Sequence, residues 1–378
     1  MNTPDPIYLD HNATTPLLPE VVEAMLPYLR DHFGNPSSSH VFGARAHAAI
    51  EHARTQVAAL LGCNPSEILF TSGGTEANNL AIRGVLEAVG ARRRVVTSTI
   101  EHPATEQPCA WLERQGVQVT RLGVDPLGQV QLPDAIATDT ALVTVMHANN
   151  ETGVLQPIEA LAQRAHAAGA WLHTDAAQTP GKVPTQVDKL GVDLLSMAGH
   201  KLYAPKGVGA LYVRRGTPLA PFTLGAGHEQ GLRPGTENVA SIVGLGAACL
   251  AAHRDLADTA AHMTRLRDML HQRLQDAIPG LALNGHPQQR LPNTLNVRFP
   301  GTSGDAVLQQ APDIAASTGS ACHTGKPSAS AVVLAMGVPA VEAIGSVRLT
   351  LGRHTSEVDV ERAATALISA WHNALSTA

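Results

Sequence analysis

Several side chains that could do chemistry stand directly after short apolar runs of this sequence. They comprise a lysine, a carboxylate, two amides and two imidazoles: His102, Asn150, Asp175, Gln178, His200 and Lys201. In a parallel sheet, ligands bind beyond the carboxyl ends of the strands. If the apolar runs are strands of one sheet, these side chains meet at one edge.

This set meets the needs of pyridoxal phosphate, an aromatic cofactor with an aldehyde and a phosphate. A lysine holds the aldehyde carbon, a carboxylate keeps the pyridine nitrogen protonated, an imidazole can stack on the ring, and amides can bond the phenolic oxygen. Lys201 is preferred over Lys182, Lys189 and Lys206 because it directly follows a predicted strand. Each residue alone also has a structural explanation, such as a helix cap for Asp175; the set indicates the cofactor.

A phosphate site is predicted after the apolar run 68–70. The sequence continues as Thr-Ser-Gly-Gly-Thr-Glu, which includes Gly74 and Thr75, and then becomes helical. Small residues at the start of a helix expose backbone N–H groups and the positive end of its dipole, which suits a phosphate. Taken alone, this stretch fits a tight turn with a Ser/Thr cap equally well.

Cys322 differs from the other cysteines because it lies in a run of small residues with two glycines, 315–328. Cys63, Cys109 and Cys249 are interpreted as small core residues, and no CxxC pair is present. An ordinary exposed loop would explain the surroundings of Cys322. A catalytic thiol that must reach the cofactor and then deliver its cargo would need such a loop as well.

The elements that position these residues indicate an α/β protein. Between residues 60 and 215, helical patterns alternate with short runs that are apolar on both faces, which is typical of a largely parallel sheet with two covered faces. Residues 238–277 predict one long helix or two. Beyond them, 294–299 and 346–351 alternate like strands and 356–375 predicts a closing helix. We expect a large domain over 16–255, and a smaller α+β domain from 1–15 and 256–378.

Composition excludes other classes of protein. The formal net charge is −5, so nothing suggests a nucleic-acid footprint, and none of the zinc spacings occurs among the 18 histidines. No secretory signal and no stretch of about 20 apolar residues is apparent. We therefore expect a cytoplasmic protein with neither a metal nor a membrane span.

The motifs resemble those of the cysteine desulfurases in the class V aminotransferase superfamily, over nearly the whole chain. In order along the chain they are YLDHNATT from Tyr8, FGNPSS from Phe33, TSGGTE from Thr71, MHANNETG from Met146, HTDAAQ from His173, GHKLYAPKG from Gly199, RPGTEN from Arg233, GSAC from Gly319 and SVRLTLGR from Ser346. The resemblance implies the fold of type I pyridoxal-phosphate enzymes, with a seven-stranded sheet, and conversion of L-cysteine to L-alanine.

Roles follow from the resemblance position by position. Lys201 is implied as the lysine that holds the cofactor, Asp175 as the partner of the pyridine nitrogen and His102 as the stacking residue that assists proton transfer. Other cofactor contacts are implied for Gly74, Thr75, Asn150, Gln178 and His200. Asn35 and Arg348 match groups that bind the substrate carboxylate, for which the arginine fork is suited.

The resemblance also implies partners. Thr236 matches the threonine that family dimers lend to the neighbouring subunit's phosphate site, so a homodimer is expected. Cys322 is implied to receive the sulfur as a persulfide for delivery to an acceptor protein. Enzymes of this kind serve iron–sulfur cluster assembly, tRNA thiolation and DNA phosphorothioation.

Two positions depart from the family pattern, and other activities compete. Ala198 stands where a serine usually contacts the phosphate, and His228 stands where glutamine is more usual. Selenocysteine lyase shares the scaffold, and an aminotransferase or kynureninase-like lyase on this fold would not need Cys322. A non-catalytic scaffold is disfavoured by the intact set of polar residues. A thiol protease is disfavoured because the adjacent Cys322 and His323 would seldom face one another.

Overall fold

A seven-stranded mixed sheet forms the centre of the computed structural model, which describes residues 5–90, 93–319 and 329–376. The strands, in spatial order, are β2 (Ile68–Thr71), β8 (Gly209–Val213), β7 (Leu194–Ala198), β6 (Trp171–Asp175), β5 (Thr140–Thr144), β3 (Arg94–Ser98) and β4 (Gln118–Leu122). β8 runs opposite to the other six strands of this sheet. The predicted fold class, α/β with a mostly parallel sheet, is confirmed.

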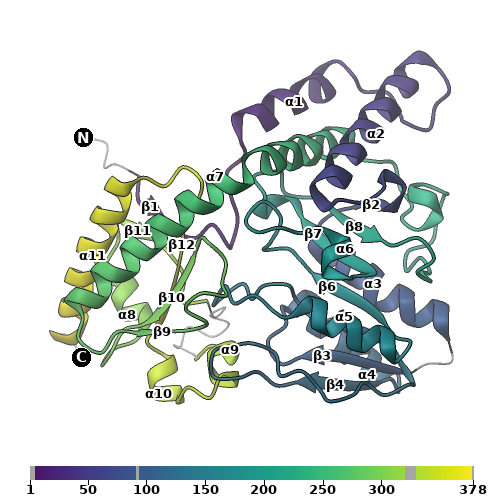
Figure 1. Ribbon diagram of the computed structural model, residues 1–378. Coiled ribbons are helices and arrows are strands. Elements are labelled where there is room, and N and C mark those ends of the chain that lie inside the picture. The colour runs from purple at the N-terminus through teal and green to yellow at the C-terminus, as the bar shows by residue number, and fades with distance from the viewer. Residues whose placement is uncertain (1–4, 91–92, 320–328, 377–378) are drawn as a thin grey trace.

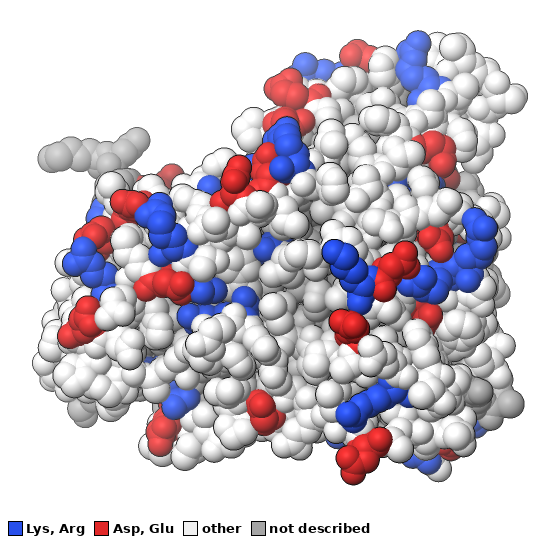
Figure 2. Space-filling view, viewed as in Figure 1, with Lys and Arg blue, Asp and Glu red and all other residues white. Residues whose placement is uncertain are grey.

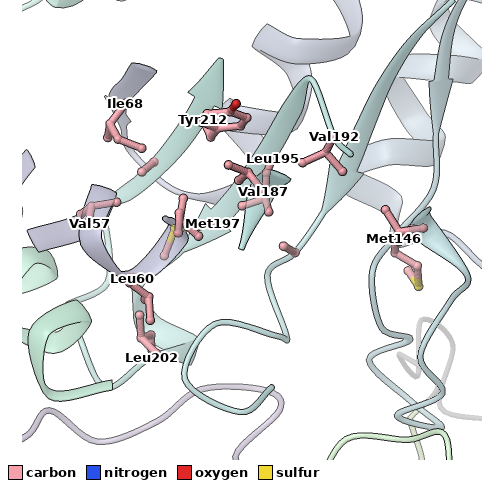
Figure 3. Close-up of a cluster of buried hydrophobic side chains, with 14 of the residues drawn as sticks. Val57, Leu60, Ile68, Met146, Val187, Val192, Leu195, Met197, Leu202 and Tyr212 are labelled. Atoms are coloured by element: carbon pink, nitrogen blue, oxygen red, sulfur yellow. The ribbon is translucent and has the colours of Figure 1, made fainter. Parts of the chain in front are cut away.

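Helices cover both faces of this sheet, and strand alternation distributes the apolar side chains between them (Figure 1). In β7, Leu194 packs with α3 (Gly74–Val89) and α4 (Pro103–Arg114), whereas Leu195 packs on the opposite face. That opposite face is covered by α1 (Pro19–Arg30), α2 (Val41–Leu61), α5 (Ile158–Ala167) and the short α6 (Val187–Leu190). Figure 3 shows part of this second core, where Leu195, Met197 and Tyr212 lie with Val187. Successive strand residues point to opposite faces, so both cores are apolar.

A separate core lies toward the C-terminus. It is built on a three-stranded antiparallel sheet of β9 (Ala282–Leu283), β10 (Thr294–Arg298) and β12 (Ser346–Thr350), with α8 (Gly304–Gln309) and α11 (Glu357–Ser376) packed on it. The helices α9 (Ala331–Ala335) and α10 (Ala340–Ala343) precede β12. The strands and closing helix predicted for this region are confirmed to within a residue or two.

One long helix, α7 (Val239–Ala277), joins the two regions and confirms the prediction of a long helix there (Figure 1). Its first half contributes Ile242, Leu245 and Cys249 to the core beside the large sheet, where it packs against α1 and α2. Its second half contributes Leu266 and Leu270 to the C-terminal core. Among the described residues α7 alone has the length and hydropathy of a membrane span, but half of that apolar window is buried, as in a core helix.

The N-terminal segment crosses between the two regions. β1 (Ile7–Tyr8) pairs in parallel with β11 (Ile314–Ala315), and Leu9 is buried in the C-terminal core. Farther along, the backbone N–H of Thr15 donates to the carbonyl oxygen of His200 at 2.9 Å. Residues 10–15 therefore form a wall between the end of the large sheet and β12. The proposed domain boundaries, 16–255 against 1–15 and 256–378, remain a prediction.

Charged side chains of both signs are interspersed on the face shown in Figure 2. Cys109 and Cys249 are buried free thiols, as predicted for core residues, and Cys63 is half-buried. Burial raises the pKa of Cys63 and of Cys109 to about 12, which makes these thiols poor nucleophiles.

Candidate active site

The loops at the carboxyl ends of the sheet strands and the N-terminal wall enclose a cavity of about 410 Å3. This volume lies within the roughly 300–1,000 Å3 of ligand pockets. Nine of the predicted site residues line it: Gly74, Thr75, His102, Asn150, Asp175, Gln178, His200, Lys201 and Arg348. Eight lie at or beyond the carboxyl ends of the sheet strands, as predicted, whereas Arg348 comes from the middle of β12.

Lys201 stands at the end of the 3-10 turn η2 (Gly199–Lys201), which directly follows β7. Its Nζ donates to the carbonyl oxygen of Asn12 at 2.7 Å. Burial and, after it, the nearby charge of Arg348 lower the pKa of Lys201 to about 8, while Asp175 and Asp10 oppose the shift. Near neutral pH the neutral, nucleophilic amine is therefore far more abundant than for an ordinary lysine, whose pKa is about 10.4.

Asp175 ends β6 and is held at both oxygens. Its Oδ1 accepts the backbone N–H of Ala177 at 2.9 Å, and its Oδ2 accepts Nδ2 of Asn78 at 2.7 Å. Asn78 is fully buried in the second turn of α3, and its own Oδ1 has no hydrogen-bond partner within the described part of the chain. The carboxylate is therefore fixed in orientation at the cavity.

His102 begins α4 and caps it, because its Nδ1 accepts the backbone N–H of Ala104 at 3.1 Å. Burial lowers the pKa of His102, so the ring is neutral at neutral pH. Beside it, the half-buried Glu101 accepts the backbone N–H of Met146, and burial raises the pKa of Glu101 to about 8. Glu101 thereby ties the loop that presents His102 to the end of β5.

The N-terminus of α3 faces the cavity with Gly74 and Thr75. Ala198 lies against Gly74, where a β-carbon added to the glycine would come within 3.3 Å of the Ala198 side chain. His200 closes this end; its Nδ1 lies 3.3 Å from Oγ1 of Thr14, and burial lowers its pKa to about 4. A helix N-terminus beside small residues suits a phosphate.

Arg348 lines the cavity beside the N-terminal wall. Its Nη2 pairs with Oδ1 of Asp10 at 2.7 Å, and its Nη1 donates to the carbonyl oxygen of Asn150 at 3.2 Å. Nε of Arg348 is buried and has no hydrogen-bond partner in the described part of the chain. The neighbouring Asn149 has a structural role instead, because its Oδ1 accepts the backbone N–H groups of Glu151 and Thr152.

Three predicted residues are not brought into this cavity. Asn35 is exposed, and its Oδ1 accepts the backbone N–H of Ser37. Thr236 is also exposed, in a segment held by an ion pair between Arg233 and Glu76 at 2.9 Å. Cys322 lies outside the described residues. The roles of all three stay predictions.

Residues without a predicted role also line or support the cavity. Asn12 and Asn78 line it, and Lys182 lies behind Gln178. The sequence offers one indication that Asn78 has a role: it is an amide among the apolar residues Ala77, Leu80 and Ala81 of a predicted helix. His228, at the second position that departs from the family pattern, accepts the backbone N–H of Gly235 at 3.3 Å and so supports the loop that carries Thr236.

The chain matches the family described as Aminotransferase class-V over residues 7–363. It belongs to that family. Cysteine desulfurase 2 from Trichormus variabilis is 48% identical to this class V chain over 94% of the chain and 90% of the relative. This likeness places the chain among the cysteine desulfurases.

Solved class V structures agree with this placement. A structure described as a NifS-like protein superimposes with a TM-score of 0.90 at 36% identity, covering 96% of this chain and 98% of the other. A structure of SspA in complex with cysteine superimposes with a TM-score of 0.81 at 35% identity, covering 92% and 99%. The predicted family is confirmed, and with it the type I fold.

The residues of this class V site fit pyridoxal phosphate. The cavity unites an amine of lowered pKa, a fixed carboxylate, a neutral imidazole and a helix N-terminus. These are the groups that the aldehyde, the pyridine nitrogen, the ring face and the phosphate require. Lys201 would hold the aldehyde carbon and Asp175 the pyridine nitrogen. His102 would lie on the ring face, and the start of α3 would hold the phosphate.

Proposed function

We propose that this chain takes sulfur from L-cysteine and releases L-alanine, with pyridoxal phosphate held by Lys201. One observation carries the proposal: the amine of Lys201, the carboxylate of Asp175, the imidazole of His102 and the guanidinium of Arg348 line one cavity. The placement among cysteine desulfurases supports the same activity. Bound pyridoxal phosphate supplies an electron sink for the carbon atoms of the amino acid.

The side chains of the cavity bind the substrate, transfer its proton and hold the cofactor. Arg348 binds the carboxylate of the incoming amino acid, because its guanidinium lines the cavity and its planar fork suits a carboxylate. Lys201, whose pKa of about 8 makes the neutral amine accessible, accepts the proton from the α-carbon of cysteine. His102 assists that transfer, and Asp175 keeps the pyridine nitrogen protonated. Gly74, Thr75 and His200 hold the phosphate, while Asn150 and Gln178 bond the cofactor.

Cys322 receives the sulfur in this proposal. Its thiolate attacks the sulfur of the substrate, an S–S bond forms and the C–S bond of cysteine breaks, and the electron pair of that bond stays with the carbon. Protonation of that carbon yields alanine, so cysteine and one thiol become alanine and one persulfide. The persulfide is then passed to an acceptor protein.

The test uses the purified protein with pyridoxal phosphate, L-cysteine and a reducing thiol. We expect alanine and sulfide in equal amounts. Cys322→Ser should abolish both while the visible absorbance of the bound cofactor persists, and Cys63→Ser should behave like the wild type. Sulfide release by Cys322→Ser would refute the role of Cys322, and loss of its absorbance would show that the residue belongs to the cofactor site.

Selenocysteine lyase is the second candidate, because the cavity has Ala198 where the desulfurase pattern has a serine. Rates on L-cysteine and L-selenocysteine, measured side by side, separate the two activities. A higher kcat/KM on L-cysteine supports the first proposal. Activity on selenocysteine alone would replace it.

We further propose a cytoplasmic homodimer with composite sites. Asn35 and Thr236 are exposed and lie outside the cavity of their own chain, so a second copy could receive them. The same two segments carry exposed apolar side chains, with Phe33 80% and Leu224 86% exposed. Burial of such side chains favours association. A monomer in sedimentation at micromolar concentration would contradict this arrangement.

A further inference from the structure

A second lysine, Lys182, is buried directly behind the cavity. It lies in the loop after β6 with 5% of its surface exposed. Its Nζ lies 3.0 Å from Oε1 of Gln178 and 3.2 Å from Oδ1 of Asn12. No carboxylate pairs with it in the ranges that the structure describes. An unpaired buried lysine is costly, so its retention here calls for a reason.

Lys182 determines which end of the Gln178 amide faces the cavity wall. A glutamine amide can present its oxygen or its NH2 group to a given neighbour, because the two ends have nearly the same shape. Lysine has no acceptor when charged, so it selects the oxygen. The NH2 group of Gln178 is thereby directed the other way, where Nε2 donates to the carbonyl oxygen of Asn12 at 3.0 Å.

That carbonyl oxygen is also the acceptor of Lys201. Nζ of Lys201 donates to it at 2.7 Å, so Gln178 and Lys201 converge on one atom of Asn12. The side chain of Asn12 is fixed in the same manner. Its Oδ1 accepts from Lys182 and from Nδ2 of Asn293, and its Nδ2 donates to Oγ1 of Thr294 at 2.9 Å. The hydrogen bonds of Lys182 thus fix the orientation of the side-chain amides of both Gln178 and Asn12.

We propose that Lys182 is a positioning residue that fixes the Gln178 amide with its NH2 group, and not its carbonyl, toward the Lys201 side of the cavity. The inference rests on the proposed function, in which Gln178 bonds the phenolic oxygen of pyridoxal phosphate. A donor stabilises that oxygen as an anion, whereas a reversed amide would present a second negative dipole to it.

The charged form of Lys182 makes the selection strict, because it has no acceptor. Burial lowers its pKa to about 7, and the charges of Lys201 and Arg348 act in the same direction. The neutral amine gains a lone pair, but its two N–H groups still match the two oxygen acceptors, Oε1 of Gln178 and Oδ1 of Asn12. Four charged groups act on Lys182 or on Lys201 at this site: the cations Lys201 and Arg348, and the carboxylates Asp175 and Asp10.

The test is a double-mutant cycle that is read in the spectrum of the bound cofactor. Lys182→Met and Gln178→Ala should each raise the pH midpoint of the visible absorption by about one unit, since the anionic oxygen loses a donor in both. If Lys182 acts through Gln178, the double variant should shift no further than Gln178→Ala. Lys189→Met, which removes an exposed lysine of α6, is the matched control and should leave the midpoint unchanged.

Two results would overturn the inference: a wild-type midpoint in Lys182→Met, or a shift in the double variant equal to the sum of the single shifts. The second result would mean that Lys182 acts by charge alone. If Lys182→Met does not fold, Lys182→Leu completes the same cycle, because it too lacks a donor for the two oxygens. A wild-type protein without visible absorption would instead refute the proposed function, so the two failures are distinguishable.

Discussion

Nδ2 of Asn78, in the second turn of α3, donates to Oδ2 of Asp175 at the end of β6 across 2.7 Å. The same helix presents its first turn to the cavity through Gly74 and Thr75. One helix therefore supports both the phosphate end and the pyridine end of the site. Any shift of α3 would misplace both groups together.

Replacement of Asn78 should accordingly weaken binding of the cofactor more than it lowers the stability of the fold. Asn78→Ala removes a hydrogen bond to a charged group, worth about 1.5–3 kcal/mol. We expect the dissociation constant of pyridoxal phosphate to rise roughly 10- to 100-fold, as measured by absorbance titration. Asn79→Ala is the matched control, because the amide of Asn79 bonds the carbonyl oxygen of Thr75 in its own helix. Equal effects of the two substitutions would argue against a role for Asn78.

Attachment of the cofactor should follow the pKa of Lys201. Only the neutral amine attacks an aldehyde, and burial lowers this pKa to about 8 from an ordinary value near 10.4. The rate of attachment to the cofactor-free protein should rise about tenfold per pH unit below pH 8 and level off above it. Stopped-flow absorbance measures this rate, with Lys201→Ala as the blank. A rate that still climbs steeply between pH 9 and 10 would contradict the lowered pKa.

Substrate binding should depend on the planar fork of Arg348. Arg348→Lys keeps the charge but loses the paired donors that hold Asp10 and the carbonyl oxygen of Asn150. We expect KM for L-cysteine to rise roughly 10- to 100-fold while the cofactor spectrum is preserved. Arg353→Lys, which alters the ion pair with Asp255, should change KM little. A fall in kcat at unchanged KM would place Arg348 elsewhere in the reaction.

Stability should depend strongly on the buried ion pair between Arg54 and Glu229. Both oxygens of Glu229 accept from Arg54, at 2.7 and 2.9 Å, and one also accepts the backbone N–H of Phe70. Glu229→Ala leaves the buried cation with only the half-exposed Glu51 as an ion-pair partner, so we expect a loss toward the lower end of the about 3–5 kcal/mol of unfolding free energy typical of broken buried pairs. Glu357→Ala removes the exposed partner of Arg265 and should cost less than about 1 kcal/mol. Urea unfolding measures both losses of unfolding free energy. Equal losses in the two variants would contradict the prediction.

Sequence patterns predict the parts of the site that follow strands. Lys201, Asp175 and His102 could be placed because each comes directly after a short apolar run, and the ends of parallel strands meet. Strand periodicity also predicts the sheet and both of its covered faces. Lys182 could not be ranked in this way, since nothing in the sequence distinguishes a lysine turned inward from one on the surface.

Asn12 was not predicted as a site residue, for a different reason. It reaches the cavity through contacts with residues far away in the chain, namely Thr350, Thr294 and Lys201. Local periodicity carries no information on which distant segments pair, so only the pairing of β1 with β11 reveals this wall. The long helix α7 was easier to predict, because its apolar pattern is continuous along the sequence.

The N-terminal wall has a consequence for biosynthesis. Its partners on β10, β11 and β12 are synthesised long after the wall itself. The segment around Asn12 therefore lacks these partners until residue 350 has been made. A nascent chain can form the large sheet earlier, but it cannot complete the pocket. Cofactor capture is thus a step that follows the synthesis of β12.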